Sequence, residues 1–270
     1  MKHKKLAITL LIIGGILLTA VIGFLIYVSI YYHADDTAQA ALQSDAQVTV
    51  TEENGRLVFA PAKPTAGLIF YPGGKVDYHA YAPLLHELAR QNMLCIAVEM
   101  PFNLAVFRPN AADGIQEAYP SVQRWYIGGH SLGGSMAALY ANGHRQQLEG
   151  LILLAAYSTA DLSDSDLCVL SVYGSEDGVL NRDKYTDNLS HLPGDYRAYI
   201  IPGGCHAYFG SYGAQKGDGE PTITPQEQVQ QTVRFIMDNL REAPAPSSKT
   251  TALTDGVTVS KNNAHRSNAA

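Results

Sequence analysis

An uncharged apolar stretch from Leu6 to Tyr32 limits what this chain can fold into more than any other sequence feature. As a helix with a rise of about 1.5 Å per residue it extends roughly 40 Å, more than the roughly 30 Å hydrocarbon thickness of a bilayer. A buried core helix of this length would need a bundle of apolar partner helices, which the remaining residues do not encode. The stretch therefore predicts one transmembrane helix over residues 6–32.

The charges on either side of this stretch predict its orientation. Three lysines lie among residues 1–5, and Asp35 and Asp36 follow the stretch. Positive charge is retained in the cytoplasm, so we expect a cytoplasmic N-terminus and an extracytoplasmic domain on a single-pass protein of the cell membrane. A cleavable signal peptide has an apolar region of only about 7 to 15 residues, which favours an uncleaved anchor. Secretion after cleavage near residues 38–40 is the alternative, because Ala-Gln-Ala resembles a cleavage site.

The rest of the chain divides into three parts by composition. Residues 33–47 are polar and rich in alanine and are expected to link the membrane to a domain. Residues 48–242 contain enough apolar runs for one core, as the size of a single domain requires. In residues 243–270 alanine, proline, serine, threonine and asparagine predominate, so this part cannot bury enough apolar surface to fold alone. It is predicted to be a disordered tail.

Net charge and cysteine content exclude several classes of protein. The net charge is -6 and the pI is about 5.8, which argues against a nucleic acid as partner. The three cysteines are too few for a disulfide scaffold, and their spacings match no zinc-ligand pattern. We therefore expect no nucleic acid partner and no bound metal.

Between residues 48 and 242, short apolar runs alternate with stretches of helical periodicity. Asn54-Gly55 separates the first two runs, Val48–Thr51 and Leu57–Ala60, and suits the tight turn of a hairpin. Further strands are expected over residues 67–71, 94–98, 125–127, 151–156, 169–173 and 199–201, and helices over residues 78–90, 132–142, 181–191 and 225–240. This alternation predicts an α/β fold with a mostly parallel sheet and helices on both faces, in which ligands bind at the carboxyl ends of the strands.

The most specific motif is the G-x-S-x-G sequence of residues 129–133, placed directly between a predicted strand and a predicted helix. A nucleophilic serine needs this arrangement because a sharp turn exposes its oxygen, while the glycines let strand and helix approach closely. Ser131 is therefore the candidate nucleophile. Its neighbour His130 is expected to pack beneath it or to give it polar support.

A nucleophilic serine also requires an acid and a base, which follow it in the order Ser, Asp or Glu, His in this architecture. Asp177 lies just after the strand that ends at Tyr173, and His206 lies just after the strand that ends at Ile201. Glu176 is the rival acid; Asp177 is preferred because it precedes Gly178 and begins the next loop. The predicted catalytic residues are Ser131, Asp177 and His206.

An oxyanion site needs two backbone N–H donors. Leu132, which follows the nucleophile, should supply one, and Gly74 in the loop after residue 71 should supply the other, with Lys75 as its alternative. Lys75 does not indicate a phosphate site, because the G-x-x-x-x-G-K-[ST] spacing is absent. His86-Glu87 does not begin a zinc motif, because Arg90 stands at the second ligand position. We expect no metal and no organic cofactor.

Two further residues near strand ends leave their roles open. Glu99 looks buried and either lines the pocket or holds a loop through hydrogen bonds to its backbone. Cys205, next to the candidate base, is either a redox-sensitive neighbour or a small packing group, and the second is the commoner use of a single cysteine.

The chain resembles the α/β-hydrolase superfamily, and more closely its compact fold-5 group, which is similar in outline to dienelactone hydrolases. The resemblance covers roughly residues 55–240 and is carried by residues 70–74 with Tyr78 and Tyr81, and by residues 98–105, 128–134, 173–178, 206–210, 212–213 and 217–219. It implies Ser131 as nucleophile, Asp177 as acid and His206 as base, although Cys205 stands where the group has Asn. Residues 157–167 are too few for a separate lid domain, so the pocket should be open.

These observations predict a membrane-anchored serine hydrolase that cleaves a carboxylic ester or a related acyl bond through an acyl-enzyme. Its partners would be a small-molecule acyl substrate, whose binding residues the sequence does not identify, and the membrane that holds the N-terminal helix. A peptidase or acyltransferase of the cell envelope with the same three residues is an alternative. A noncatalytic binding module with the same fold is another.

Overall fold

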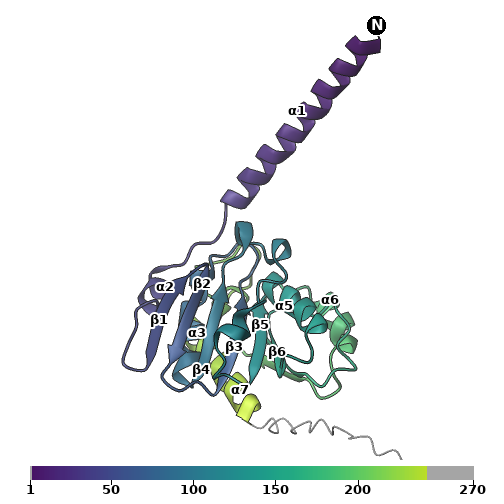
Figure 1. Cartoon of the computed structure of the whole chain (residues 1–270). Helices are drawn as coiled ribbons and strands as arrows, with labels where there is room; N and C mark the ends of the chain where they lie inside the picture. The colour runs from purple at the N-terminus through teal and green to yellow at the C-terminus, as the bar shows by residue number, and fades with distance from the viewer. Residues whose placement is uncertain (1, 242–270) are drawn as a thin grey trace, which may run out of the picture.

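The computed structural model describes residues 2–241, and the predicted tail over residues 243–270 lies outside this range. Helix α1 projects from a domain built around one sheet (Figure 1). The strands of this part of the chain are β1 Val48–Glu53, β2 Arg56–Pro61, β3 Ala66–Tyr71, β4 Met93–Val98, β5 Trp125–His130, β6 Gly150–Leu154, β7 Cys168–Gly174 and β8 Arg197–Ile201. The α-helices are α1 Lys2–Ser29, α2 Asp36–Ala41, α3 Ala82–Arg90, α4 Ile115–Ala118, α5 Leu132–Gly143, α6 Arg182–Asp187 and α7 Pro225–Arg241.

The sheet has the order β1-β2-β4-β3-β5-β6-β7-β8, and its strands are parallel from β4 to β8. At the other edge, β1 and β2 are antiparallel and form the predicted hairpin. Asn54 and Gly55 at its turn have φ angles of 53° and 69°, the positive values that such a turn requires. The predicted α/β class with a mostly parallel sheet is confirmed.

Helices cover both faces of the sheet because the central strands are buried on both sides. All six residues of β3 and all six of β5 are buried. Side chains from α3 and α7 pack into one half of the core, and those from α4 and α5 pack into the other. In Figure 1, α5 lies in front of the sheet, while α3 and α7 lie behind it.

Residues 33–47 were expected to form a linker, and they pack against the domain instead. Helix α2 begins after Asp35, whose carboxylate accepts the N–H of Ala38, and Ala38 is fully buried. The small alanines let α2 lie close to α3. Asp45 then forms an ion pair with Arg90 of α3. The alanines of residues 33–47, which were expected to belong to a linker, therefore serve close helix packing.

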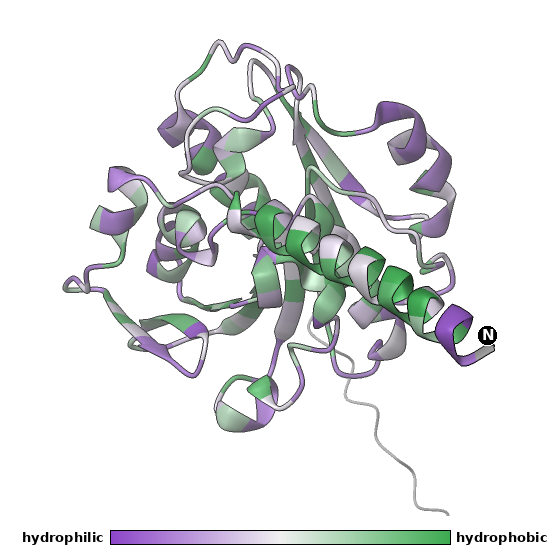
Figure 2. Ribbon diagram, turned by 90° about the horizontal axis from the view of Figure 1, so that it is seen from above, coloured by the Kyte–Doolittle hydropathy of each residue, from purple (hydrophilic) through white to green (hydrophobic). Residues whose placement is uncertain are grey.

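Helix α1 ends at Ser29, earlier than predicted, because Tyr32 already belongs to the domain. The N–H of Tyr32 donates to the carbonyl of Lys75, and the carbonyl of Tyr32 accepts the N–H of Asp77. Within the apolar span His3–Ser29, an 18-residue window has a mean hydropathy of 2.6 and no residue buried inside the protein. Its length and composition are compatible with a membrane anchor or with a signal sequence. Figure 2, which looks down on the domain, shows the apolar colouring along α1 beyond its polar first turn.

Candidate active site

Ser131 lies on a strained turn between β5 and α5, as the G-x-S-x-G motif predicts. Its φ and ψ angles are 53° and -123°, a conformation that is costly for a residue with a side chain. The glycine at position 133 is required by sterics, because a Cβ atom there would lie 2.2 Å from the carbonyl oxygens of Tyr71 and Pro72. Helix α5 therefore begins in contact with the end of β3, and this contact holds the turn in place.

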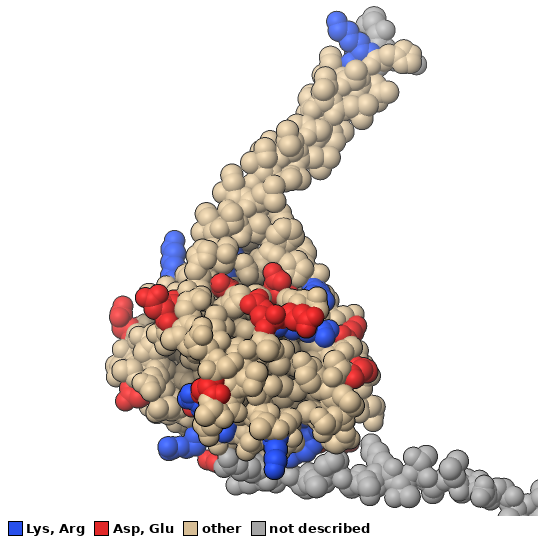
Figure 3. All heavy atoms as spheres, turned by 60° about the vertical axis from the view of Figure 1, so that its left-hand side comes forward, with Lys and Arg blue, Asp and Glu red and all other residues tan. Residues whose placement is uncertain are grey.

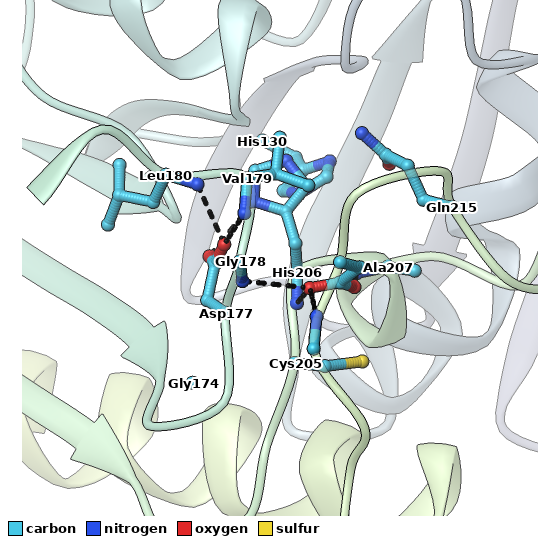
Figure 4. Close-up of polar contacts among 12 residues, drawn as sticks. His130, Gly174, Asp177, Gly178, Val179, Leu180, Cys205, His206, Ala207 and Gln215 are labelled. Atoms are coloured by element: carbon cyan, nitrogen blue, oxygen red, sulfur yellow. Dashed lines mark hydrogen bonds and ion pairs between the residues drawn. The ribbon is translucent and has the colours of Figure 1, made fainter.

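Asp177 and His206 form a buried hydrogen-bonded pair at the ends of β7 and β8. His206 Nδ1 lies 2.9 Å from Asp177 Oδ2, and their side chains are 1% and 0% exposed. The other carboxylate oxygen, Asp177 Oδ1, accepts the N–H groups of Val179 at 2.9 Å and Leu180 at 2.8 Å (Figure 4). Each oxygen therefore has a set role, which directs Oδ2 at the imidazole.

Ser131 and His206 meet at one cavity of about 240 Å³. The Nε2 atom of His206 is buried and has no hydrogen-bond partner among residues 2–241. No hydrogen bond joins this atom to the Ser131 hydroxyl in the same part of the chain. The remaining walls come from the first turns of α5 and from the loops after β6 and β7: Leu132, Ser135, Ala155, Ala156, Tyr157, Val179, Leu180 and Asn181. The structure thus brings together the three side chains that the sequence singled out. The hydrogen bond between His206 and Asp177 is formed, and the one between His206 and Ser131 is not.

The two predicted oxyanion donors are neighbours in space. A Cβ atom on Gly74 would lie 2.9 Å from the Cδ2 atom of Leu132, so the loop after β3 lies against the start of α5. Within residues 2–241, neither of these two backbone N–H groups donates to another group. Lys75, the alternative donor, uses its N–H on the carbonyl of Asn103 at 2.7 Å. Gly74 is therefore the better placed of the two candidates.

Two hydrogen bonds and a ring contact connect the Gly74 loop with the base. The hydroxyl of Tyr81 accepts the N–H of Gly73 and lies 2.9 Å from Nδ1 of His130. The ring of His130 is 4.4 Å from the ring of His206, measured between centroids. Burial, together with the nearby His206, lowers the pKa of His130 well below its usual value. His130 is therefore a neutral support beneath the site, as the sequence analysis expected.

Asp218 is a site residue to which the sequence analysis gave no role, although residues 217–219 are part of the family resemblance. Its carboxylate accepts the N–H groups of Gly178 at 3.1 Å, His206 at 3.1 Å and Ala207 at 2.8 Å. Burial raises its pKa, but these backbone N–H groups outweigh burial and leave the pKa below its usual value. The Asp218 side chain thus ties the loop of the acid to the loop of the base.

The remaining candidates lie outside the reacting centre. Glu176 is exposed and accepts the hydroxyl of its neighbour Ser175, so Asp177 is the acid that contacts the imidazole. Glu99 was expected to be buried and is exposed; its N–H donates to the carbonyl of Gly55 at the hairpin. Cys205 is buried, and burial raises its thiol pKa to about 12, which suits a packing group.

Two expectations about the surroundings of the site concern a lid and a metal. Residues 157–167 contain no helix or strand, so no lid domain covers the cavity from this connection. Over residues 2–241, no group of three or more His, Cys, Asp or Glu side chains is arranged to hold a metal ion.

Comparison with known proteins places the chain in a family. The sequence profile of the alpha/beta hydrolase family matches residues 67–230, more than half of the chain, and the protein belongs to this family. A search of curated proteins finds no match.

Solved structures share the fold at low sequence identity. TT1662 from Thermus thermophilus superposes with a TM-score of 0.54 at 15% identity, over 72% of this chain and 98% of its own. A Klebsiella pneumoniae protein provisionally named a dienelactone hydrolase gives a TM-score of 0.54 at 16% identity, over 72% and 99%. Est1E from Butyrivibrio proteoclasticus gives 0.50 at 13% identity, over 73% and 100%. At these identities the likeness concerns the fold alone.

Proposed function

We propose that this protein is a serine hydrolase that cleaves carboxylic esters through an acyl-enzyme, and that α1 anchors it in the cell membrane with the domain outside. The observation that carries the proposal is the buried pair of His206 and Asp177, which shares a cavity with a serine held on a strained turn. An imidazole that donates Nδ1–H to a buried carboxylate keeps Nε2 free to take a proton. Its unpartnered Nε2 suits that role.

The first half of the proposed reaction forms the acyl-enzyme. As the Ser131 oxygen attacks the ester carbonyl carbon, its proton moves to Nε2 of His206. Negative charge develops on the carbonyl oxygen and is stabilised by the N–H groups of Leu132 and Gly74. The tetrahedral intermediate then collapses, the carbon–oxygen bond to the alcohol breaks, and the alcohol leaves with the proton from Nε2.

The second half repeats these steps with water as the nucleophile. His206 takes a proton from water, whose oxygen attacks the acyl carbon, and the bond to Ser131 breaks as the proton returns to the serine oxygen. Asp177 stabilises the imidazolium that forms twice in each cycle. The ester preference rests on chemistry, since an alkoxide leaving group needs less help from a proton donor than an amine does.

Covalent labelling tests this proposal against a noncatalytic binding module. We expect a fluorophosphonate to label the full-length protein, and to fail to label Ser131→Ala or His206→Ala. Ser163→Ala, which removes an exposed hydroxyl, is the matched control and should be labelled like the wild type. Labelling that persists in Ser131→Ala would refute the proposal. A panel of esters, amides and acyl acceptors then separates hydrolase, peptidase and acyltransferase activities.

A further inference from the structure

We propose that the catalytic edge of the domain faces the bilayer that holds α1, and that the substrate is a long-chain acyl ester drawn from that bilayer. The contacts that lead to this inference join α1, the loop of residues 101–107 and the two expected oxyanion donors. The inference rests on the proposed esterase function and on membrane insertion of α1.

The chain between α1 and the domain is too short to let the domain turn freely. Two residues, Ile30 and Tyr31, separate the end of α1 from Tyr32. Tyr32 pairs with Val76 in a parallel bridge and donates its N–H to the carbonyl of Lys75. The three residue steps from Ser29 to Tyr32 span at most about 11 Å. The loop that carries Gly74 is therefore held close to the end of α1.

Side chains of α1 also contact the domain directly, at the loop of residues 101–107. The ring of Phe24 lies 5.3 Å from that of Phe102 and 5.8 Å from that of Phe107, and those two rings lie 5.6 Å apart. One turn further along α1, Val28 is 7% exposed. Lys75 places its ammonium group 4.0 Å from the centre of the Tyr27 ring, an arrangement suited to the membrane interface.

The loop of residues 101–107 presents an apolar surface next to α1. Phe102, Val106 and Phe107 are 47%, 45% and 51% exposed, while the other large exposed apolar side chains of the described domain, Leu139 and Ile200, lie on other elements. Phe102 has a φ angle of 58°, which is strained for a bulky residue. Exposed aromatic rings beside an apolar helix have a natural partner in lipid, because water solvates them poorly.

The depth of α1 in a bilayer places this loop at the membrane surface. Roughly 30 Å of hydrocarbon corresponds to about 20 helical residues, so a span that begins at Leu6 reaches the far boundary near Leu25. Phe24 lies at that boundary, and the rings of the loop that contact it share its depth. Figure 3 agrees with this placement, because charged side chains lie on the domain and at the free end of α1, and none lies along the helix between them.

The same loop reaches the site. Leu104 lies between the exposed phenylalanines, and its Cδ2 atom would be 3.6 Å from a Cβ atom on Gly74. Gly74 in turn contacts Leu132, which follows the nucleophile. The cavity beyond has apolar side chains on part of its wall, among them Ala155, Ala156 and Val179, beside polar groups. An ester at the depth of the lipid headgroups can therefore reach Ser131 while its acyl chain remains in contact with apolar surface.

Fluorescence quenching tests the membrane contact without reference to activity. Full-length Phe107→Trp and Ile200→Trp are reconstituted in vesicles of phosphatidylcholine and phosphatidylglycerol, with and without brominated acyl chains. The native Trp125 is 3% exposed and gives the background, which the wild-type protein measures. We expect the brominated lipid to quench the added emission of Phe107→Trp about twofold and to leave Ile200→Trp unchanged. Equal quenching of the two, or none in either, would overturn the inference.

Hydrolysis in the same vesicles tests the substrate class. The measured quantity is the ratio of two rates, one for a long-chain nitrophenyl ester dissolved in the bilayer and one for a water-soluble nitrophenyl butyrate. We expect this ratio to fall about tenfold in the Phe102→Ser/Phe107→Ser double variant and to stay at the wild-type value in Ile200→Ser. A wild-type protein that hydrolyses butyrate and yields the same ratio as the double variant refutes this inference and leaves the proposed function standing. A wild-type protein inert toward both esters refutes the proposed function, and the substrate inference with it.

Discussion

The substitution Asp177→Asn tests the site most directly, because the surroundings of this carboxylate fix which way an amide would point. Asp177 Oδ1 accepts two backbone N–H groups, so the amide oxygen of an asparagine would take its place. The amide NH₂ would then face Nδ1 of His206, where Oδ2 lies at 2.9 Å. To accept that N–H, Nδ1 must give up its proton, so the neutral ring carries its proton on Nε2. Such a ring cannot take a proton from Ser131.

The expected loss can be worked out from this geometry. Returning the proton to Nδ1 leaves two buried donors facing each other, which costs about 1 to 3 kcal/mol. The transition state also loses the carboxylate beside the imidazolium, worth about 4 kcal/mol at an effective dielectric constant near 20. Together these terms correspond to a fall in kcat/KM of about four orders of magnitude. The pair is fully buried, so water cannot substitute for the missing charge.

The assay is kcat/KM for a soluble nitrophenyl ester, with Glu176→Gln as the matched control. That control makes the same chemical change at the adjacent, exposed position and should retain wild-type activity. A thermal midpoint near the wild-type value would show that Asp177→Asn still folds. The reasoning is refuted if Asp177→Asn keeps more than about a tenth of the wild-type kcat/KM, or if Glu176→Gln loses as much activity.

Three further predictions concern the surroundings of the site and the stability of the domain. Asp218→Asn places an NH₂ where a carboxylate oxygen joins the loops of acid and base, and should lower kcat about tenfold with little change in KM, whereas the exposed Asp166→Asn should leave kcat unchanged. Gly133→Ala inserts a methyl group 2.2 Å from two carbonyl oxygens and should destabilise the domain by about 3 kcal/mol in denaturant unfolding. Gly143→Ala, at the free end of the same helix, should not destabilise it, because nothing lies within 4 Å. Hydrogen bonds to neighbouring carboxylates raise the pKa of His79 from 6.5 to about 9, so its stabilising contribution should be complete below pH 6.5 and lost as pH rises through 9. Thermal midpoints measured across that range should fall less in His79→Gln than in the wild type.

The parts of the fold that the sequence predicted depend on interactions between near neighbours. The Asn54-Gly55 turn, the buried central strands and the strained turn at Ser131 all follow from short windows of residues, because backbone sterics and apolar periodicity act locally. The chain order of the motifs then pointed to Asp177 and His206, which the fold places as a hydrogen-bonded pair.

The features that the sequence analysis missed involve residues far apart in the chain. Asp218 joins two loops that follow different strands, and Tyr81 connects the turn after β3 with His130 at the end of β5. Glu99 looked buried beside an apolar strand, but its side chain faces solvent at the hairpin. No pattern within a window of a few residues contains these pairings.

The sequence by itself determined the class of fold, the apolar helix at the N-terminus and the kinds of chemical group available to a site. Local apolar periodicity and turn chemistry are sufficient to determine these three features, because periodicity and turn chemistry are properties of the chain over a few residues. Only the tertiary structure decided that residues 33–47 pack on α3, that Gly74 rather than Lys75 has a free N–H, and that Phe24 meets the loop beside the site. Those outcomes depend on how the sheet order and the crossovers bring distant segments into contact, which no local pattern encodes.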